Sequence, residues 1–250
     1  MSNTLKAVIA AGGSGTRLRP LTTVTNKHLL PVYNKPVIFY AIEKLVNSGI
    51  DRIMIVTSKD EVDTFIKLLG SGEAFTSANS GKQIQITYGI QNKPNGFIYC
   101  MYIAKEYIGD DNCALYLGDN IFEDDLSKTI REFKTGATVF LKDVPDPKRF
   151  GIATIKDGLV VGVTEKPKQP KSNLAVTGLY LFDNSIFKKI AKLKPSARGE
   201  LEGTHVLNQY IREKALTAHI LRHEWFDVGT FDNLLRAGVY MQDKSKHGEI

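Results

Sequence analysis

Short apolar runs and longer segments with helical periodicity alternate along the first half of the chain. Lys6–Ala11 is an apolar run that glycines end, and Pro36–Asn47 repeats its apolar residues with a helical period, with proline in the first turn. Strand–helix–strand repetition at this spacing is typical of right-handed βαβ units around a parallel sheet. The predicted strands are Lys6–Ala11, Arg52–Thr57, Gln83–Gln91 and Ala114–Leu117, and the predicted helices are Pro36–Asn47, Asp60–Leu69 and Gly96–Ile108.

The pattern changes after about residue 137, where short strands follow one another closely before helices return. The predicted strands are Ala137–Lys142, Gly151–Ile155, Leu159–Val163, Ala175–Phe182 and the extended segment Thr217–Leu221. The predicted helices are Ser185–Lys192, Val206–Lys214 and Phe231–Gln242. No linker separates the two halves. We therefore predict a single α/β domain over residues 1–250, with a Rossmann-like mixed, mostly parallel sheet and helices on both faces.

The composition is that of an ordinary globular protein. Of the 250 residues, 42% are hydrophobic and 24% are charged, which excludes a disordered chain, a collagen and a disulfide scaffold. The two cysteines, Cys100 and Cys113, are expected to be buried small hydrophobic residues. No apolar run approaches the roughly 20 residues of a membrane span, and the N-terminal run is too short for a signal peptide. The expected location is therefore cytoplasmic, without a membrane partner.

The charge balance is modestly basic. Lys plus Arg number 33 against 27 Asp plus Glu, giving a net charge of +6 and a pI of about 9.1. This excess fits either a nucleic-acid surface or a pocket for a small polyanion. Because the basic residues are spread along the chain, a nucleic-acid partner is not expected.

A glycine-rich string, Gly12-Gly13-Ser14-Gly15, follows the first predicted strand. Backbone N–H groups approach phosphates in such a setting, where a Cβ would block the approach or the positive φ angles. The string matches neither the P-loop nor the Rossmann fingerprint, and it carries Arg17 instead. A guanidinium beside a glycine cradle suits a polyphosphate. A tight turn with a surface arginine explains the same residues, so the string alone leaves both readings open.

A longer series of strings runs in order along nearly the whole chain. Its members are Ala11–Leu18, Pro20–Thr22, Lys27, Leu29–Val32, Leu117–Phe122, Asp146–Pro147, Arg149–Gly151, Glu165–Pro167, Pro170–Asn173, Ala175–Tyr180, Lys194–Glu202 and Trp225–Thr230. The series resembles the sugar-1-phosphate nucleotidyltransferases, and within them the branch that acts on glucose 1-phosphate and dTTP. An ordered series of this length is far more specific than any single motif.

The resemblance implies a fold of the nucleotide-diphospho-sugar transferase type and a Mg²⁺ ion held by Asp119 and Asp227. Asp119 directly follows an apolar strand, at the edge where open α/β sheets bind ligands. Arg17 would hold the β- and γ-phosphates, Lys27 would reach the triphosphate, and Lys166 would grip the phosphate of the sugar. Taken singly, each of these residues has an ordinary explanation as a loop aspartate or a solvated cation.

The same resemblance implies two binding regions. Residues 1–136 would mainly hold the nucleotide, through Ala10, Ala11, Gly12, Gly13, Ser14, Gly15, Thr16, Gln91 and Gly96. Residues 137–250 would mainly hold the sugar phosphate, through Gly151, Glu165, Val176, Tyr180 and Glu200, with Asn120 added from the first half.

The implied activity is Mg²⁺-dependent transfer of a nucleotidyl group from dTTP to glucose 1-phosphate, giving dTDP-glucose and pyrophosphate. Two alternatives stay open: the same chemistry with another nucleotide such as UTP or another sugar 1-phosphate, and a catalytically silent binder of nucleotide sugars. The partners would be a nucleoside triphosphate and a sugar 1-phosphate, and a homo-oligomer is left open.

Three places in the chain, two of them strings of several residues, depart from the family pattern. A string of the type G-L-A-Q-A is replaced by Gly96–Cys100, the glutamine after Lys27 is His28, and E-L-E-I-T-D is replaced from Glu202 by Gly203-Thr204-His205. These changes place the identity of the base and the sugar in question. The chain also ends soon after the last predicted helix, so we expect a short form without an assumed regulatory site. His219 and His223 have a spacing that binds zinc on a helix, but their segment is predicted to be extended.

Overall fold

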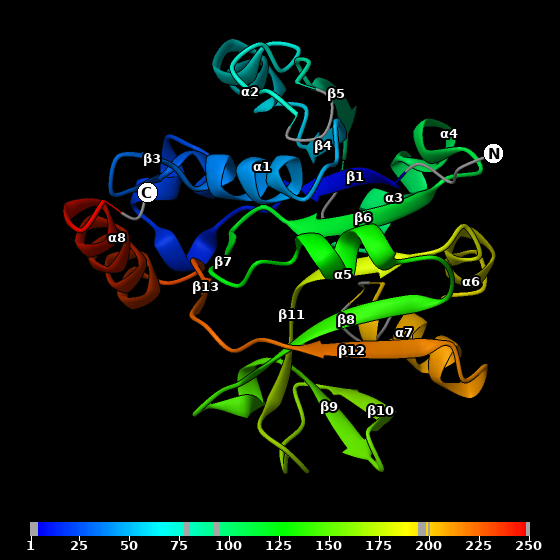
Figure 1. Cartoon of the computed structure of the whole chain (residues 1–250). Helices are drawn as coiled ribbons and strands as arrows, with labels where there is room; N and C mark the ends of the chain where they lie inside the picture. The colour runs from blue at the N-terminus through cyan, green and yellow to red at the C-terminus, as the bar shows by residue number, and fades with distance from the viewer. Residues whose placement is uncertain (1–4, 78–80, 93–95, 195–198, 200, 249–250) are drawn as a thin grey trace.

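A nine-stranded sheet forms the centre of the described structure, a computed structural model that covers residues 5–77, 81–92, 96–194, 199 and 201–248 (Figure 1). Its strand order is β10-β9-β11-β6-β1-β4-β5, and β8 and β12 extend it from β11. The strands are β1 (Leu5–Ala10), β4 (Arg52–Thr57), β5 (Gln85–Ile90), β6 (Asn112–Leu117), β8 (Ala137–Asp143), β9 (Gly151–Lys156), β10 (Leu159–Glu165), β11 (Leu174–Phe182) and β12 (Leu216–Ile220).

Both halves of the chain contribute strands to this sheet. The strands β6, β1, β4 and β5 are mutually parallel, as the βαβ pattern predicted. The long strand β11 runs antiparallel to β6, β8 and β9, while β12 pairs in parallel with β8. The hairpin of β9 and β10 projects away from the parallel strands at the bottom of Figure 1. The sheet is therefore mixed, and β11 joins its two parts.

Helices cover both faces of the sheet because β1 presents alternate residues to opposite sides. Ala7 and Ile9 face the helices α1 (Val37–Asn47), α2 (Val62–Leu69) and α5 (Ser127–Glu132). Val8 and Ala10 face α3 (Tyr99–Ile103), α4 (Lys105–Ile108), α6 (Ile186–Ile190) and α7 (Gly203–Arg212). The period of two along a strand thus creates two apolar cores, one on each side.

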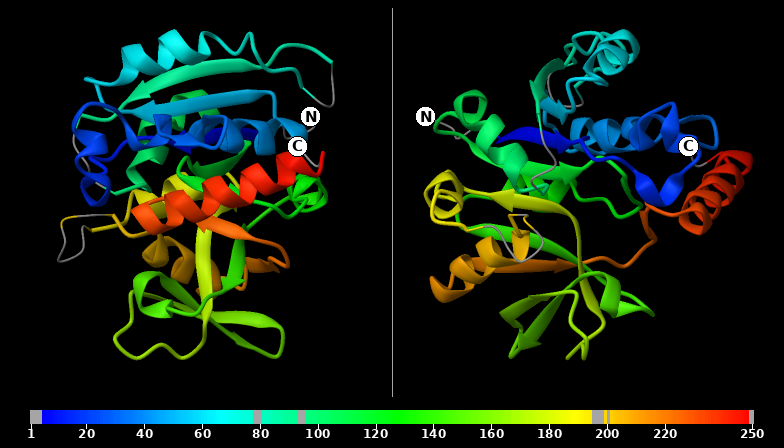
Figure 2. Two further views of the ribbon diagram at one scale, coloured as in Figure 1. Left: turned by 90° about the vertical axis from the view of Figure 1, so that its left-hand side faces the viewer. Right: turned by 180° about the vertical axis from the view of Figure 1, so that it is seen from behind.

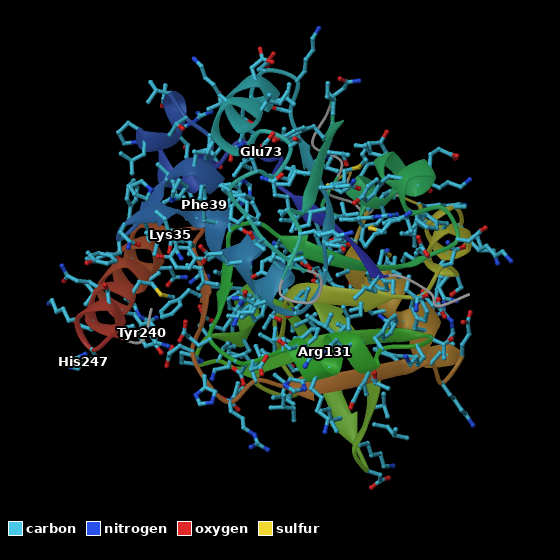
Figure 3. The ribbon with its side chains drawn as sticks, turned by 45° about the horizontal axis from the view of Figure 1, so that its top comes forward. Lys35, Phe39, Glu73, Arg131, Tyr240 and His247 are labelled. Atoms are coloured by element: carbon cyan, nitrogen blue, oxygen red, sulfur yellow. The ribbon has the colours of Figure 1, made fainter. Side chains whose placement is uncertain are left out.

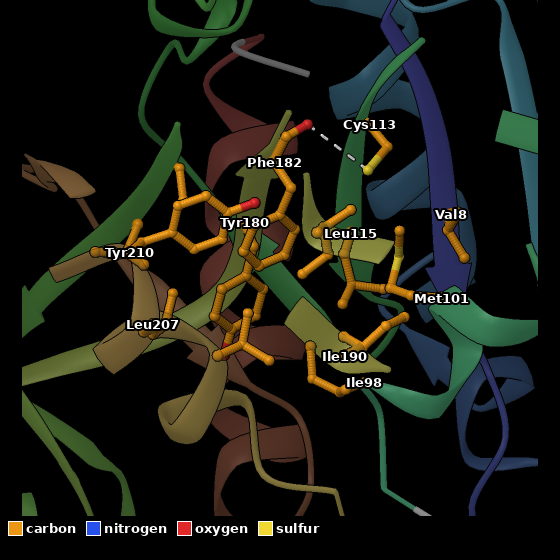
Figure 4. Packing of buried hydrophobic residues seen from close by; sticks show 14 of the residues in the cluster. Val8, Ile98, Met101, Cys113, Leu115, Tyr180, Phe182, Ile190, Leu207 and Tyr210 are labelled. Atoms are coloured by element: carbon orange, nitrogen blue, oxygen red, sulfur yellow. Dashed lines mark hydrogen bonds between the residues drawn. The ribbon is translucent and has the colours of Figure 1, made fainter. Parts of the chain in front are cut away.

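Figure 4 shows the core on the side of α3, α6 and α7. Met101 of α3 and Leu115 of β6 are fully buried there, together with Cys113, whose Sγ lies 3.7 Å from the carbonyl oxygen of Phe182. Cys100 is buried as well, so both cysteines occupy the interior positions expected of them. Burial raises the pKa of the Cys100 thiol to about 12, which keeps it protonated.

The opposite core depends on large residues of the central strands. Phe140 of β8 is fully buried and its ring lies 5.5 Å from the ring of His219 on β12. We expect Phe140→Ala to lower the free energy of unfolding by about 3–5 kcal/mol, because it removes buried apolar area and leaves a cavity. Urea unfolding followed by circular dichroism measures this loss. A change below about 1 kcal/mol would show that the site collapses around the smaller side chain.

Two small sheets lie beside the main one. One joins β2 (Pro31–Val32) to β3 (Lys35–Pro36), and the other joins β7 (Asn120–Phe122) to β13 (Trp225–Asp227). The last helix, α8 (Phe231–Lys246), packs Ala237 and Met241 against this second pair, and Tyr240 lies 5.3 Å from Phe226 between ring centroids (Figures 2 and 3). Single-turn 3-10 helices occur at Thr16–Leu18, Leu21–Thr23, Lys27–Leu29 and Pro147–Arg149.

The predicted helix Gly96–Ile108 is instead two short helices, α3 and α4, joined at Ala104. Ala104 has φ −84° and ψ 0°, which opens the turn between them. The buried positions Cys100, Met101, Ala104 and Ile108 keep their helical spacing across this junction. Apolar periodicity therefore could not reveal the interruption.

None of the helices in the described ranges is long and apolar enough to cross a lipid bilayer. His219 does not lie on a helix, as the zinc-binding spacing of His219 and His223 would require. It lies on the extended strand β12, where its Nδ1 is 3.0 Å from Thr129 Oγ1. Among the described residues, no cluster of three or more His, Cys, Asp or Glu is arranged to hold a metal ion.

Candidate active site

A cavity of about 720 Å³ opens at the carboxyl ends of β1 and β6. It lies where β6 leaves the sheet and its continuation, β7, pairs with β13. Most of the residues predicted to carry function line it, although they come from distant parts of the chain. They are Ala10, Gly12, Gly13, Arg17, Lys27, Gln91, Gly96, Asp119, Asn120, Glu165, Lys166, Val176, Tyr180 and Asp227.

The other predicted residues within the described ranges do not line the cavity. Ala11 is fully buried, and its carbonyl oxygen accepts hydrogen bonds from Asn26 Nδ2 and Thr57 Oγ1. Gly151 pairs across β9 and β10 with Glu165, which lines the cavity. Ser14, Gly15 and Thr16 lie in the loop between Gly13 and Arg17. Glu200 lies outside the described residues.

The pairing of β7 with β13 brings two carboxylates to one side of the cavity. Asp227 is opposite Asn120 in this pairing, and the N–H of Val228 donates to the carbonyl oxygen of Asp119 at 2.8 Å. Lys27 donates a hydrogen bond to Asp119 Oδ2, and Asn120 Nδ2 donates to Asp119 Oδ1 at 3.0 Å. Two aspartates 108 positions apart in sequence therefore share one charged cluster with a lysine.

The two carboxylates have opposite pKa shifts. Burial raises the pKa of Asp119, but the Lys27 ammonium outweighs that effect and the Asn120 amide assists, so the pKa lies well below its usual value. Burial and the negative charge of Asp119 raise the pKa of Asp227 to about 6. Asp119 is thus firmly ionised, and the nearby cations Lys27, Arg17 and Arg149 do not fully offset the cost of ionising Asp227 beside it. An added cation between them would relieve this cost.

Arg17 approaches the same cluster through the backbone of Gly229. A Cβ at Gly229 would lie 2.8 Å from Arg17 Nη2 and 3.1 Å from Asp227 Oδ1, so a side chain there would displace the guanidinium from its present position. Throughout the described part of the chain, Arg17 makes no ion pair within 4.0 Å. Its guanidinium therefore remains available to an anion in the cavity.

The glycine loop and Gln91 form one end of the cavity. A Cβ at Gly12 would lie 3.1 Å from Gln91 Oε1, and Gly13 has a φ of 128°, which L-residues with a side chain rarely adopt. Gln91 is buried, and its Oε1 accepts a hydrogen bond from the Cys100 thiol at 3.6 Å. Gly96, with a φ of 87°, turns the chain into the segment before α3. Glycines and the amide of Gln91 thus line this end.

Asn120 links the carboxylates to the other end. Its Oδ1 accepts a hydrogen bond from Trp225 Nε1 at 2.7 Å, which fixes the orientation of the amide. A Cβ at Gly178 would lie only 2.4 Å from Asn120 Cγ, so the close packing of β11 against this side chain requires glycine. Val176 and Tyr180 of β11 continue this wall, where Glu165 and Lys166 also line the cavity. Lys166 has a φ of 41° and a half-exposed side chain.

His28, which departs from the family pattern, is buried beside Lys27 and lines the cavity. Its Nδ1 is 2.6 Å from Asn26 Oδ1, which also accepts from the backbone N–H of His28 at 2.8 Å. Burial and the neighbouring Lys27 lower the pKa of His28 to about 3, so the imidazole is neutral near pH 7. The departure therefore replaces the polar amide of glutamine with another uncharged polar group.

The match to known sequences decides the family. The family model described as nucleotidyl transferase matches residues 6–244, which is nearly the whole chain. The chain belongs to the nucleotidyl transferase family. This match confirms the predicted resemblance to the sugar-1-phosphate nucleotidyltransferases.

Individual members of this family are similar over most of their length. The glucose-1-phosphate thymidylyltransferase of Neisseria meningitidis is 40% identical over 245 residues, covering 95% of this chain and 83% of that protein. The glucose-1-phosphate thymidylyltransferase of Mycolicibacterium smegmatis is 39% identical over 244 residues, covering 95% and 82%.

Solved structures agree with the fold. A crystal structure assigned as a glucose-1-phosphate thymidylyltransferase from Bacillus anthracis, in complex with sucrose, has a TM-score of 0.89 and 43% identity, with 96% of each chain covered. A UDP-glucose pyrophosphorylase complexed with UDP-glucose has a TM-score of 0.83 at 23% identity, which shows the shared fold alone. The predicted class, a Rossmann-like mixed sheet with helices on both faces, is confirmed.

This nucleotidyl transferase also has cavity residues to which sequence reasoning gave no role. Arg149 is the last residue of a 3-10 helix, lines the cavity, and its positive charge lowers the pKa of Asp227. Glu202 is buried and also lines the cavity. Trp225 orients Asn120, as described above. All three lie inside strings that carry the family resemblance, so their position in those strings was the available signal. Their contacts depend on chain segments that only folding brings together.

Proposed function

We propose that this protein transfers the thymidylyl group of dTTP to glucose 1-phosphate, producing dTDP-glucose and pyrophosphate. One observation carries the proposal: Asp119 and Asp227 share a single cavity with the cations Arg17, Lys27 and Lys166. A reaction between two polyanions needs this combination, because positive charge must hold both partners while carboxylates bind a metal ion. Relatives named glucose-1-phosphate thymidylyltransferase supply the identity of the substrates.

The chemistry requires little covalent work from the protein. An oxygen of the sugar phosphate attacks the α-phosphorus of dTTP, one new P–O bond forms, and the bond to the β-phosphate oxygen breaks to release pyrophosphate. The side chains must align the two phosphates and stabilise the charge that builds up on the leaving group. Arg17 and Lys27 stabilise the leaving pyrophosphate, and Lys166 holds the attacking phosphate.

The carboxylates fit a magnesium ion. Mg²⁺ prefers hard oxygen ligands and usually takes one or two carboxylates, with phosphates and water completing its shell. Burial and the neighbouring ionised Asp119 raise the pKa of Asp227, so a cation bound by both carboxylates would favour the ionised form of Asp227. When bound, the ion would withdraw charge from the phosphate oxygens, and Asp119 and Asp227 would hold it.

The two ends of the cavity suit the two substrates. Residues 1–136 contribute the glycine loop and Gln91, whose amide can hydrogen-bond the edge of a pyrimidine while Gly96 leaves room for the ring. Residues 137–250 contribute mainly the opposite end, where the Glu165 carboxylate can accept hydrogen bonds from sugar hydroxyls. Each half of the chain therefore binds mainly one substrate.

A substrate panel tests the proposed function. Pyrophosphate release is measured with Mg²⁺ for dTTP, UTP, CTP, GTP and ATP, each against glucose 1-phosphate and other sugar 1-phosphates. The highest kcat/KM is expected for dTTP with glucose 1-phosphate. Preference for another pair would support the same reaction with different substrates. The departure of Phe97–Cys100 from the family pattern is the reason to test this alternative. Tight binding of nucleotide sugars without release would instead favour a silent binder.

Lys166→Ala is expected to raise the KM for glucose 1-phosphate about 10- to 100-fold, since it removes a charged hydrogen-bond donor from the phosphate. The KM for dTTP should change by less than about twofold, because Lys166 lies at the sugar end. Initial rates with each substrate varied in turn separate the two constants. Lys168→Ala, at an exposed position two residues further on, is the matched control. Equal increases in both KM values would contradict the assignment of Lys166 to the sugar phosphate.

A further inference from the structure

Two positions that depart from the family pattern, 97 and 203, meet in the structure. A Cβ at Gly203 would lie 2.4 Å from Cζ of the Phe97 ring and 3.1 Å from its Cε2. Gly203 is the first residue of α7 and has no positive φ, so neither helix geometry nor a turn requires glycine there. The Phe97 ring therefore occupies the space that a side chain at position 203 would fill.

The Phe97 ring also packs against a stack of three further aromatic rings. Phe97 stacks on Tyr180 with 5.4 Å between ring centroids and 20° between ring planes. Tyr180 stacks on Phe182 at 5.9 Å, and Phe182 stacks on Tyr210 at 5.8 Å (Figure 4). Tyr180 and Phe182 are buried on β11, the strand that joins both parts of the sheet. Phe97 is thus the last ring of this stack and the one that is partly exposed to the cavity.

The ring faces the sugar end of the cavity. Its neighbours, Tyr180 and Gly203, belong to elements of the second half of the chain, and the cavity-lining residues Leu201 and Glu202 directly precede Gly203. Cys100, three residues after Phe97, instead contacts Gln91 at the nucleotide end. The segment around α3 therefore separates the two ends, with Phe97 on the sugar side.

We propose that Phe97 and Gly203 form one specificity-determining pair, in which the glycine makes room for a ring that closes the sugar end with an apolar wall. This wall favours hexose 1-phosphates that carry only hydroxyl substituents and rejects those that carry an N-acetyl group. A hydroxyl fits beside the ring, whereas the larger N-acetyl group would have to displace a ring that fills this space, and its buried amide would find no partner there. The inference rests on the proposed function and adds to it the class of sugar that the site accepts.

A substitution cycle tests the pair. Gly203→Ala forces the Phe97 ring to tilt from its place against Tyr180, so the KM for glucose 1-phosphate should rise about tenfold or more. The KM for dTTP should stay within about twofold. Combining Gly203→Ala with Phe97→Leu should restore the KM for glucose 1-phosphate, because leucine lacks the ring atoms that the new Cβ would meet. Gly238→Ala in α8, where the nearest atom is 3.8 Å from the added Cβ, is the matched control.

Phe97→Leu alone tests the sugar class. It should raise the ratio of kcat/KM for N-acetylglucosamine 1-phosphate over glucose 1-phosphate about tenfold, since it shortens the apolar wall. Melting temperatures of the four proteins show whether any loss is a failure to fold. An unchanged ratio, or additive effects in the double variant, would overturn the pair while wild-type turnover still supports the proposed function. Absence of wild-type turnover with every substrate would overturn both.

Discussion

Replacing Asp119 with asparagine should lower kcat/KM for the nucleotidyl transfer about a thousandfold, because a charged group that organises the reacting centre is lost. The asparagine keeps the volume of the side chain, so packing in the cavity is preserved. It removes one of the two carboxylates proposed for the metal ion, and it also releases Lys27 from its partner. The buried position of Asp119 makes this loss difficult for water to compensate.

Two controls make the Asp119 result specific. Asp143→Asn changes an exposed carboxylate at the end of β8 and should leave the rates unchanged. The concentration of Mg²⁺ needed for half-maximal activity should rise in Asp119→Asn, while the melting temperature stays close to that of the wild type. If Asp119→Asn keeps more than about a tenth of the wild-type activity at ordinary Mg²⁺, the metal assignment is wrong.

Removing the side chain of Arg17 should lower kcat about a hundredfold, because the leaving pyrophosphate loses a charged donor. The KM for glucose 1-phosphate should hardly change, since Arg17 is proposed to hold the leaving pyrophosphate and not the sugar phosphate. The close approach at Gly229 and the absence of an ion pair among the described residues support this role. Single-turnover measurements of dTTP consumption isolate the chemical step.

Arg131→Ala is the matched control for Arg17→Ala. Arg131 is exposed on α5 and does not line the cavity (Figure 3). Arg17→Lys should recover part of the rate, because a lysine supplies the charge but not the paired donors of a guanidinium. An Arg17→Ala variant with an unchanged single-turnover rate would remove Arg17 from the mechanism.

The sequence predicts the parallel part of the fold well because that part depends on local patterns. The run Arg52–Thr57 coincides with β4, and the glycine string follows β1 as expected. The strand β7 has three residues and pairs with β13 more than a hundred positions away, so no local period marks it. That pairing is what places Asp119 beside Asp227, and its existence had to come from the structure.

The candidate site, like the fold, was predicted from the sequence only in part. Resemblance to a family selects Lys27 and Lys166 from 33 basic residues that composition alone cannot separate. It does not reveal contacts that depend on this chain's own departures. Phe97 and Gly203 are each a deviation in sequence, and only their spatial contact shows that the large residue and the missing side chain compensate one another. Such a contact joins positions more than a hundred residues apart and leaves no trace in either local string.

Phosphorus-31 NMR of the protein with dTTP, glucose 1-phosphate and Mg²⁺ tests the proposed reaction most directly. The expected spectrum loses the signals of dTTP and glucose 1-phosphate and gains those of a sugar-linked diphosphate and pyrophosphate in equal amounts. Omission of glucose 1-phosphate should leave dTTP intact. Unchanged substrates, or conversion of dTTP without a sugar-linked diphosphate, would contradict the assignment of this cavity to thymidylyl transfer.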